Sequence, residues 1–222
     1  MYRLKLQPGL VLSVLFMAII FHSVVSTANA QNRPGAINRP CFRLENILNM
    51  PSDSLSQSEL NGLIFMREEE KLARDVYIVL LQTWGQRIFN NISRSEQTHM
   101  DAIKILLKKY KVSDPVTTDS VGVFTNQTLQ KLFNELTARG KTSLAEALKV
   151  GALIEEIDIL DLQKELQAIK GNDDLRYVYE NLKRGSENHL RAFVRNLQRL
   201  GIQYSPVKLS NEEFTAIVTS NF

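Results

Sequence analysis

The feature that most constrains the fold is a set of four long segments in which apolar residues recur every three or four positions. This spacing places the apolar residues on one face of an α-helix. The segments cover about residues 56–83, 91–110, 143–169 and 174–200, and about 30 residues separate the second from the third. Strong strand signals are absent. We therefore expect an all-α chain, built as a four-helix bundle with one long crossover between helices two and three.

Residues that cap or break helices support these boundaries. Ser56 and Glu59 have the spacing of a capping box, as do Ser143 and Glu146. Gly85 is placed to end the first long helix. The remaining expected elements are an irregular connection and two short extra helices, at about residues 113–125, 128–138 and 210–218.

Each apolar stripe is interrupted near its middle by side chains that can bind a metal ion. Beyond residue 30 the chain has only two histidines, and both fall on these stripes. The coincidence in four separate segments indicates a common site inside the bundle. The candidate ligands are Glu70, Glu96, His99, Glu155, Asp158 and His189.

The charges of these groups point to cations. A carboxylate that is buried without a partner costs several kcal/mol, so four that converge must be protonated, paired or bound to cations. Four carboxylates with two imidazoles suit a pair of iron or manganese ions with bridging carboxylates. The basic residues of the same helices fall on other faces and do not obviously neutralise the set; they are Arg67, Lys71, Arg74 and Arg191.

Other interpretations of single residues stay open. A lone buried histidine often hydrogen-bonds a backbone carbonyl, and a lone acid often marks the edge of a stripe. A small helix rotation would exchange Glu69 or Glu156 for its neighbouring candidate. Tyr77 either hydrogen-bonds a ligand carboxylate or only packs in the core. We expect a solvated, salt-bridged face for Glu68, Glu69, Lys71 and Arg74.

The stripe residues also lie in motifs that resemble a known family. REEEKLARDVY, which starts at Arg67, contains the Glu-x-x-Ala-Arg-x-x-Tyr pattern of the first rubrerythrin helix, and SEQTHMDA resembles the second. With GALIEEIDILDL and RGSENHLRAF, these segments resemble a ferritin-like branch that is catalogued as a domain of unknown function in archaea and bacteria. The resemblance covers about residues 60–204 and implies a ferritin-like four-helix bundle with a di-iron site.

The sequence departs from the rubrerythrin pattern in three respects. Asp158 replaces the longer Glu of rubrerythrins, which would either compensate for a missing ligand or alter the metal spacing. Three residues before His189 stands Ser186, where the family has a carboxylate. Glu187 is close but lies about 100° around the helix from Ser186, so it is at best a substitute or an indirect contact. The chain also has no Cys-x-x-Cys pair, so the electron-relay iron centre of rubrerythrins is absent. Redox turnover would require an external electron donor.

The start of the chain predicts export. Arg3 and Lys5 precede an apolar run, and Ala28-Asn29-Ala30 has the small-x-small pattern of a signal peptidase site. We expect a periplasmic or extracellular protein with no stable membrane span after cleavage; an uncleaved anchor is the alternative. The expected divisions are a signal peptide, a flexible tail and the helical bundle, at residues 1–30, 31–56 and 57–222.

The charge and the cysteine content of the chain limit the kinds of partner and metal site that we expect. Removal of the signal segment takes the 27 basic residues to 25, against 24 acidic ones, so the mature charge is near +1. This balance gives no reason to expect nucleic acid as a partner. Cys41 is the only cysteine, which excludes an internal disulfide and a thiolate-rich metal site.

The candidate functions differ in what the bound ions do. The first is an oxidoreductase that acts on peroxide or dioxygen, or that oxidises ferrous iron, with Glu70, Glu96, His99, Glu155, Asp158 and His189 as ligands and not as acids or bases. The second is a metal-binding or structural bundle without turnover. The third is a metal-free binding domain in which the six groups form a buried polar network.

Overall fold

The computed structural model describes residues 44–220. Within this range the chain forms seven helices and no strand, which confirms the predicted all-α class. The predicted signal peptide and half of the predicted tail lie outside the described residues. Between residues 44 and 220, no helix is both long and apolar enough to cross a membrane.

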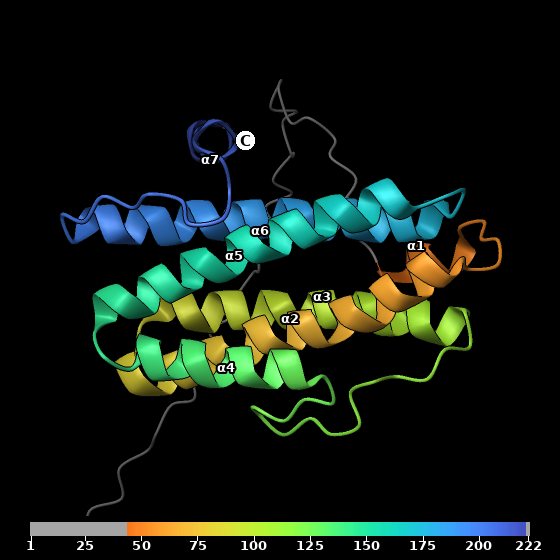
Figure 1. Cartoon of the computed structure of the whole chain (residues 1–222), viewed down its shortest axis with the longest axis horizontal. Helices are drawn as coiled ribbons and strands as arrows, with labels where there is room; N and C mark the ends of the chain where they lie inside the picture. Colours follow the sequence, from red (N-terminus) through yellow and green to blue (C-terminus); the bar gives the residue numbers. More distant parts are fainter. Residues whose placement is uncertain (1–43, 221–222) are drawn as a thin grey trace, which may run out of the picture. The chain divides into compact units, whose positions relative to one another are not determined.

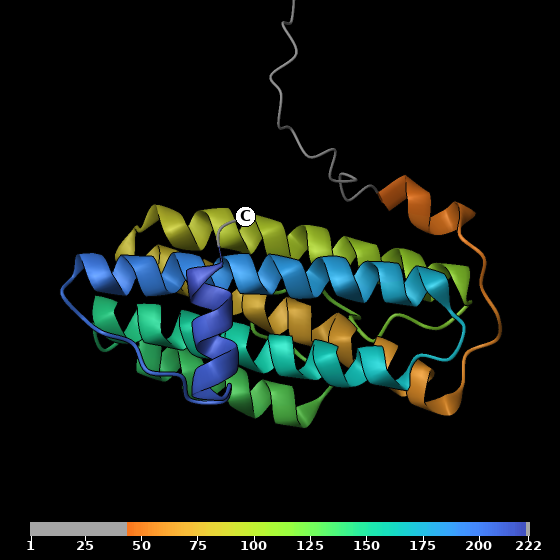
Figure 2. The same ribbon diagram turned by 90° about the horizontal axis from the view of Figure 1, so that it is seen from above.

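Four long helices lie side by side and make up most of the described fold (Figures 1 and 2). They form two helical hairpins, α2 with α3 and α5 with α6. Gly85 and Gly171 lie in the two connections with φ of 62° and 89°, a left-handed conformation that glycine adopts without a steric penalty. The four helices are α2 (Gln57–Trp84), α3 (Arg87–Lys109), α5 (Leu144–Ala168) and α6 (Asp173–Arg199).

Three shorter helices cover parts of these hairpins. α4 (Gln127–Gly140) packs against α2 and α5, and α7 (Asn211–Thr219) packs against α6. α1 (Leu44–Asn49) contacts α3 and α6 and lies in the segment that we expected to be a flexible tail. Ile47 of α1 is fully buried, and Lys109 donates to its carbonyl at 3.0 Å. This end of the predicted tail is therefore attached to the helices.

Most of the predicted helix starts lie within about one residue of the observed ones, but α3 begins at Arg87, about four residues before the predicted start near residue 91. The two predicted capping boxes have different outcomes. Ser56 and Glu59 form a complete capping box at the start of α2. At the start of α5 the Ser143 hydroxyl accepts from the backbone N–H of Glu146, but the box is incomplete. The Glu146 carboxylate instead accepts from Arg139 at 2.8 Å, because a charged donor attracts it more strongly than a backbone amide does.

The apolar core consists of two clusters that are separated along the helices by a polar layer. On α2, Leu63 and Met66 belong to one cluster, whereas Ala73 and Tyr77 belong to the other. Glu70 is buried between them. Each of the other three long helices likewise contributes apolar residues to both clusters. The four stripes therefore bring their polar interruptions to one level of the bundle.

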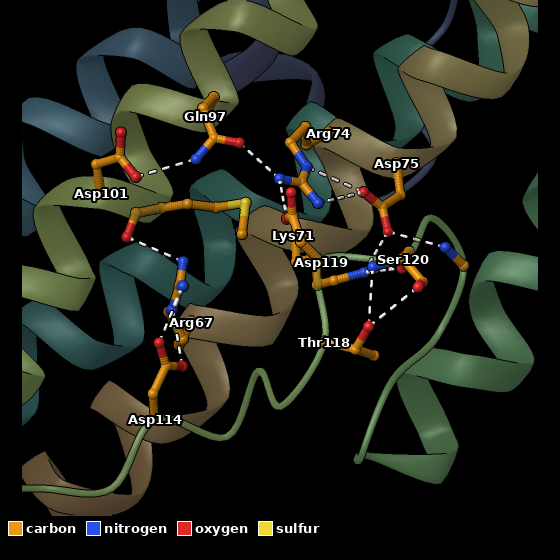
Figure 3. A network of polar contacts seen from close by, with 12 residues as sticks. Arg67, Lys71, Arg74, Asp75, Gln97, Asp101, Asp114, Thr118, Asp119 and Ser120 are labelled. Carbon is orange, nitrogen blue, oxygen red and sulfur yellow. Dashed lines mark hydrogen bonds and ion pairs between the residues drawn. The ribbon is translucent and has the colours of Figure 1, made fainter.

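The crossover between α3 and α4 lies over one face of α2 and is held there by charged groups (Figure 3). Arg67 donates from two nitrogens to the carboxylate of Asp114, each at 3.0 Å. Lys71 contacts Asp75 at 2.5 Å and donates to the carbonyl of Ser120 at 2.8 Å. The crossover is thus fixed to α2 by a network of ion pairs and backbone contacts, in which the Lys71–Asp75 pair is fully buried.

This arrangement corrects one prediction. The expected solvated face is wrong, because Glu68, Glu69, Lys71 and Arg74 are each at most 5% exposed. The crossover covers that face and supplies hydrogen-bond partners to it. Backbone N–H groups of Thr125 and Asn126, for example, donate to the two oxygens of Glu68 at 2.5 and 3.0 Å.

We predict that Asp75→Ala strongly destabilises the fold. Both Asp75 and its partner Lys71 are fully buried, so the substitution leaves a buried ammonium group without its counter-charge. The free energy of unfolding should fall by about 3–5 kcal/mol. It is measured by urea unfolding followed by circular dichroism.

Asp119→Ala is the matched control. Its carboxylate also pairs with a basic residue of α2, Arg74, but its side chain is 83% exposed. Its loss should cost about 1 kcal/mol or less, because solvent screens exposed ion pairs. Equal losses for the two variants would contradict the assigned role of the buried network.

Candidate metal centre

The polar layer contains all six candidate ligands. Glu70 comes from α2, Glu96 and His99 from α3, Glu155 and Asp158 from α5, and His189 from α6. All six side chains are buried, and the two imidazole rings have centroids 5.7 Å apart. Four helices therefore contribute these groups to the same layer of the fold.

One trio of these groups consists of Glu70, Glu96 and His99. The Nδ1 atom of His99 lies 2.7 Å from Oε2 of Glu96 and 3.1 Å from Oε2 of Glu70. One ligand atom from each of the three residues lies within 4.8 Å of the other two. Two carboxylate oxygens and one imidazole nitrogen are thus close enough to bind a single ion.

A second trio consists of Glu96, Glu155 and His189. The Nδ1 atom of His189 lies 2.8 Å from Oε1 of Glu96 and 3.4 Å from Oε2 of Glu155. One ligand atom from each of these three residues again lies within 4.8 Å of the other two. Glu96 belongs to both trios and presents a different oxygen to each, which is the arrangement of a bridging carboxylate.

The buried atoms of the layer lack ordinary partners. Among the described residues, several polar atoms of the layer are buried without a hydrogen bond, although buried polar groups in proteins are nearly always paired. His189 Nδ1 and Glu96 Oε1 are close without hydrogen-bond geometry. Lone pairs that converge in this way suit a cation, so the residues fit metal ions. The unpaired atoms are Oε1 of Glu70, Oε1 of Glu96, Oδ1 of Asp158 and Nδ1 of His189.

Burial and the charges of neighbouring groups shift the pKa values of these side chains in opposite directions. Burial raises the pKa of Glu70 to about 7, although His99 partly opposes the shift. Burial would also raise the pKa of Glu96, but the imidazoles of His189 and His99 outweigh it and lower that pKa. Burial lowers the pKa of His189, yet the carboxylates of Glu96 and Glu155 raise it to about 10. Positive charge is therefore strongly favoured between these carboxylates.

Two further side chains orient the candidate ligands. The Tyr77 hydroxyl donates to Oε1 of Glu155 at 2.5 Å, while its ring packs against Phe193. Tyr77 thus fulfils both roles that the sequence left open. Ser95 Oγ lies 3.0 Å from Nε2 of His189, which leaves Nδ1 to face the carboxylates. No periodic pattern marks Ser95 in the sequence, because this contact depends on how α3 and α6 pack.

Asp158 has a separate position in the layer. It belongs to neither trio, and the Ser186 hydroxyl donates to its Oδ2 atom. Its other oxygen has no partner among the described residues. Ser186 stands where the rubrerythrin pattern has a carboxylate on α6. Its hydroxyl instead binds the Asp158 carboxylate, which comes from α5.

The alternative ligands have different environments. Glu156 is fully buried but accepts from the Tyr204 hydroxyl at 2.6 Å and from the backbone N–H of Lys208 at 2.7 Å. Glu187 pairs with Lys183 at 3.1 Å. Neither is directed to the trios. Glu69 is buried beside Asp158 and is not part of either trio.

The basic residues of α2 do not neutralise the layer, as predicted. They pair instead with Asp114, Asp75 and Asp119 (Figure 3). Over residues 44–220 the chain is therefore all-helical, with two buried carboxylate–histidine clusters that could each hold a metal ion.

Comparison with known proteins shows the family. The chain belongs to the family described as "Uncharacterized protein domain (DUF2202)", which it matches over residues 59–221. It is 51% identical over 178 residues to the uncharacterized protein MJ0754 of Methanocaldococcus jannaschii, a match that covers 80% of this chain and 96% of that protein. All six candidate ligands lie inside the family region.

A solved structure shares the fold. It is described as the crystal structure of hypothetical protein MJ0754 from Methanococcus jannaschii DSM 2661. The TM-score is 0.76 at 50% sequence identity, and the match covers 78% of this chain and 98% of that one.

We predict that Ser95→Ala weakens metal binding. Loss of the contact to Nε2 frees the His189 ring to turn, and removal of such an outer contact typically costs about 10–100-fold in metal affinity. The measurement is titration of the metal-free protein with Mn²⁺ by calorimetry.

Ser93→Ala is the matched control, because Ser93 lies on the same helix as Ser95 but donates to the carbonyl of Asn90 within that helix. It should bind Mn²⁺ like the wild type. An unchanged affinity in the Ser95 variant would show that this contact does not orient the ligand.

Proposed function

We propose that the protein is a ferritin-like four-helix bundle whose dinuclear iron or manganese centre makes it an exported oxidoreductase. Its substrates would be peroxide or dioxygen, or ferrous iron itself as the species oxidised. The observation that carries the proposal is the shared Glu96, which faces His99 with one oxygen and His189 with the other.

The helix order supports the ferritin-like part of this proposal. Di-metal bundles of that class use four long helices, one long crossover and Glu-x-x-His motifs that point inward. Here the crossover follows α3, and Glu96 and His99 lie three residues apart on that helix. The second Glu-x-x-His motif is replaced by Ser186 and His189, with Asp158 of α5 held by Ser186.

The donor set supports the choice of metal. Carboxylate oxygens with one imidazole nitrogen per ion suit iron or manganese, whereas zinc and copper sites in proteins more often contain thiolates or several imidazoles. Glu70 and His99 would hold one ion, Glu155 and His189 the other, and Glu96 would bridge them. Bound iron would supply the redox chemistry, exchanging electrons with the O–O bond of peroxide or dioxygen.

The residues around the centre would control access and geometry. Each trio offers three donors, so positions remain for an external ligand, as in other iron sites that react with oxygen. Tyr77 fixes Glu155, and Ser95 fixes His189. The apolar clusters on both sides keep bulk water from the layer, which strengthens the electrostatic interactions inside it.

The electrons would come from outside the chain. Cys41 is the only cysteine, so the protein cannot hold a four-cysteine iron centre of its own. Reduction of peroxide to water consumes two electrons, which either ferrous iron or an external donor must provide. We propose a periplasmic or extracellular location, with no nucleic acid as a partner, on the basis of the N-terminal pattern and the nearly balanced charge.

A non-catalytic metal-binding bundle is the second candidate. It is favoured by the central position of the layer, where ions would join helices that otherwise present like charges to one another. In that case the ions would stabilise the fold without turnover.

We predict that the protein binds two iron or manganese ions per chain and that Glu96→Ala abolishes binding of both. Glu96 belongs to each trio, so its loss leaves two donors for each ion. Metal content after anaerobic loading and desalting is measured by plasma mass spectrometry. Glu187→Ala is the control, since this acid pairs with Lys183 outside the trios. A metal-free wild type after loading would contradict the proposed centre.

We further predict that the reduced, iron-loaded protein consumes hydrogen peroxide or dioxygen, and that Glu96→Ala does not. The rate is followed with a peroxide or oxygen electrode, and Glu187→Ala again serves as the control. A loaded protein that is inert to both oxidants, but is destabilised to heat by a chelator, would favour the non-catalytic bundle instead.

A further inference from the structure

A second group of carboxyls lies beside the proposed centre. Glu69 of α2 and Asp158 of α5 are each 5% exposed and line a small cavity that is otherwise apolar. α4 packs against α2 and α5 (Figure 1). It contributes Leu132 and Leu136 to the cavity wall. Two carboxyls therefore meet in a poorly hydrated space without using the ligands of either trio.

Both carboxyls present unpaired atoms. Oε2 of Glu69 and Oδ1 of Asp158 are buried, and neither has a hydrogen-bond partner among the described residues. Asp161, one turn further along α5, comes within hydrogen-bonding range of Glu69. Since carboxylates only accept hydrogen bonds, these groups can pair only by sharing a proton or a cation.

The surroundings of Glu69 are negative. Asp158 lines the same cavity as Glu69, and Glu70 is its neighbour on α2. The basic residues of the same helix are engaged elsewhere, Lys71 with Asp75 and Arg74 with Asp75 and Asp119. A divalent cation would supply the positive charge that these carboxyls lack.

The group also extends towards solvent. Asp161 is half-buried and lines a surface groove of about 350 Å³ between α2 and α5, together with Asn61, Phe65, Lys164 and Glu165. The Lys164 side chain is 77% exposed and pairs with Glu165 at 3.6 Å, so its charge is offset by that carboxylate. Asp158, at the inner end, acts electrostatically on Glu70 of the first trio. Asp161, Glu69 and Asp158 thus form a series of oxygen ligands from the groove to the polar layer.

We propose that Asp161, Glu69 and Asp158 form an accessory divalent-cation site through which ferrous iron passes from the groove to the dinuclear centre. This inference rests on the proposed function, because it requires a centre that takes up iron. The site contains only oxygen donors, which bind a divalent ion more weakly than a set with imidazole and allow it to move on. Iron is then a cargo of this site before it reaches the trios.

The test is the rate of iron uptake by the metal-free protein. Ferrous iron is added to the full-length mature protein under anaerobic conditions, and iron not yet bound is measured over time with a colorimetric chelator. Wild type is compared with Glu69→Gln and Asp161→Asn, which remove charge at nearly constant shape. Glu135→Gln is the control, because Glu135 lies on α4 near the same cavity but its side chain is 61% exposed.

We expect all four proteins to bind two irons at completion, with uptake slowed about tenfold or more in Glu69→Gln and Asp161→Asn only. Concentrated charge of one sign accelerates association by about 10- to 1,000-fold, so its loss should be visible in the rate. Circular dichroism confirms the fold of each variant. The half-exposed Asp161 provides the test if Glu69→Gln does not fold.

Two results would overturn the accessory site. Equal uptake rates in all four proteins would show that the carboxyls do not carry the ion. A final content below two irons in Glu69→Gln would make Glu69 a ligand of the centre and not a step towards it. A wild-type protein that takes up no iron would instead contradict the proposed function itself, whatever the variants do.

Discussion

The position of Glu96 between two imidazoles determines much of the rest of the structure. Its two oxygens lie 2.7 and 2.8 Å from Nδ1 of His99 and Nδ1 of His189. The imidazoles hold the pKa of Glu96 below its usual range although the side chain is almost completely buried. Such an arrangement is stable only if the helices that carry the three residues keep their register. Two kinds of contact maintain this register: the hydrogen bonds that orient the side chains of the polar layer, and the packing of the two apolar clusters.

The polar layer divides the core into two apolar clusters that differ in composition and in how they contact the layer. The cluster that contains Tyr77, Phe89 and Phe193 places aromatic rings next to the polar layer and directs one hydroxyl to Glu155. The other cluster is mainly aliphatic and closes the opposite side of the layer. Apolar packing must offset the cost of burying so many charged groups, because buried ion pairs alone contribute little to stability. The long helices allow this, since each reaches both clusters.

The all-α fold and the membership of the polar layer could be predicted from the sequence because both depend on periodicity within single helices. Glu70, His99 and His189 stand out since each interrupts an otherwise apolar stripe. The wrong prediction of a solvated face for Glu68 and Lys71 has a different origin. Their burial depends on the crossover, whose path over α2 leaves no periodic signal in the sequence.

The same limit applies to other residues. Ser95 reaches His189 only because α3 and α6 pack with a particular register, and Glu156 is engaged by backbone amides more than 50 positions later in the chain. Contacts of this kind connect parts of the chain that are far apart in sequence. A single sequence therefore shows which residues can bind a metal more readily than it shows which neighbours hold them in place.

The two trios differ in the parts of the chain that they join. Glu70, Glu96 and His99 all belong to the hairpin of α2 and α3, so an ion held by them would stiffen one half of the bundle only. Glu155 and His189 come from the other hairpin, so an ion shared with Glu96 would tie the two halves together. The ion would act as a crosslink between the hairpins, as a disulfide does in other proteins. This chain has a single cysteine and cannot form an internal disulfide. Separation of the hairpins would then have to break metal–ligand bonds as well as release the apolar core.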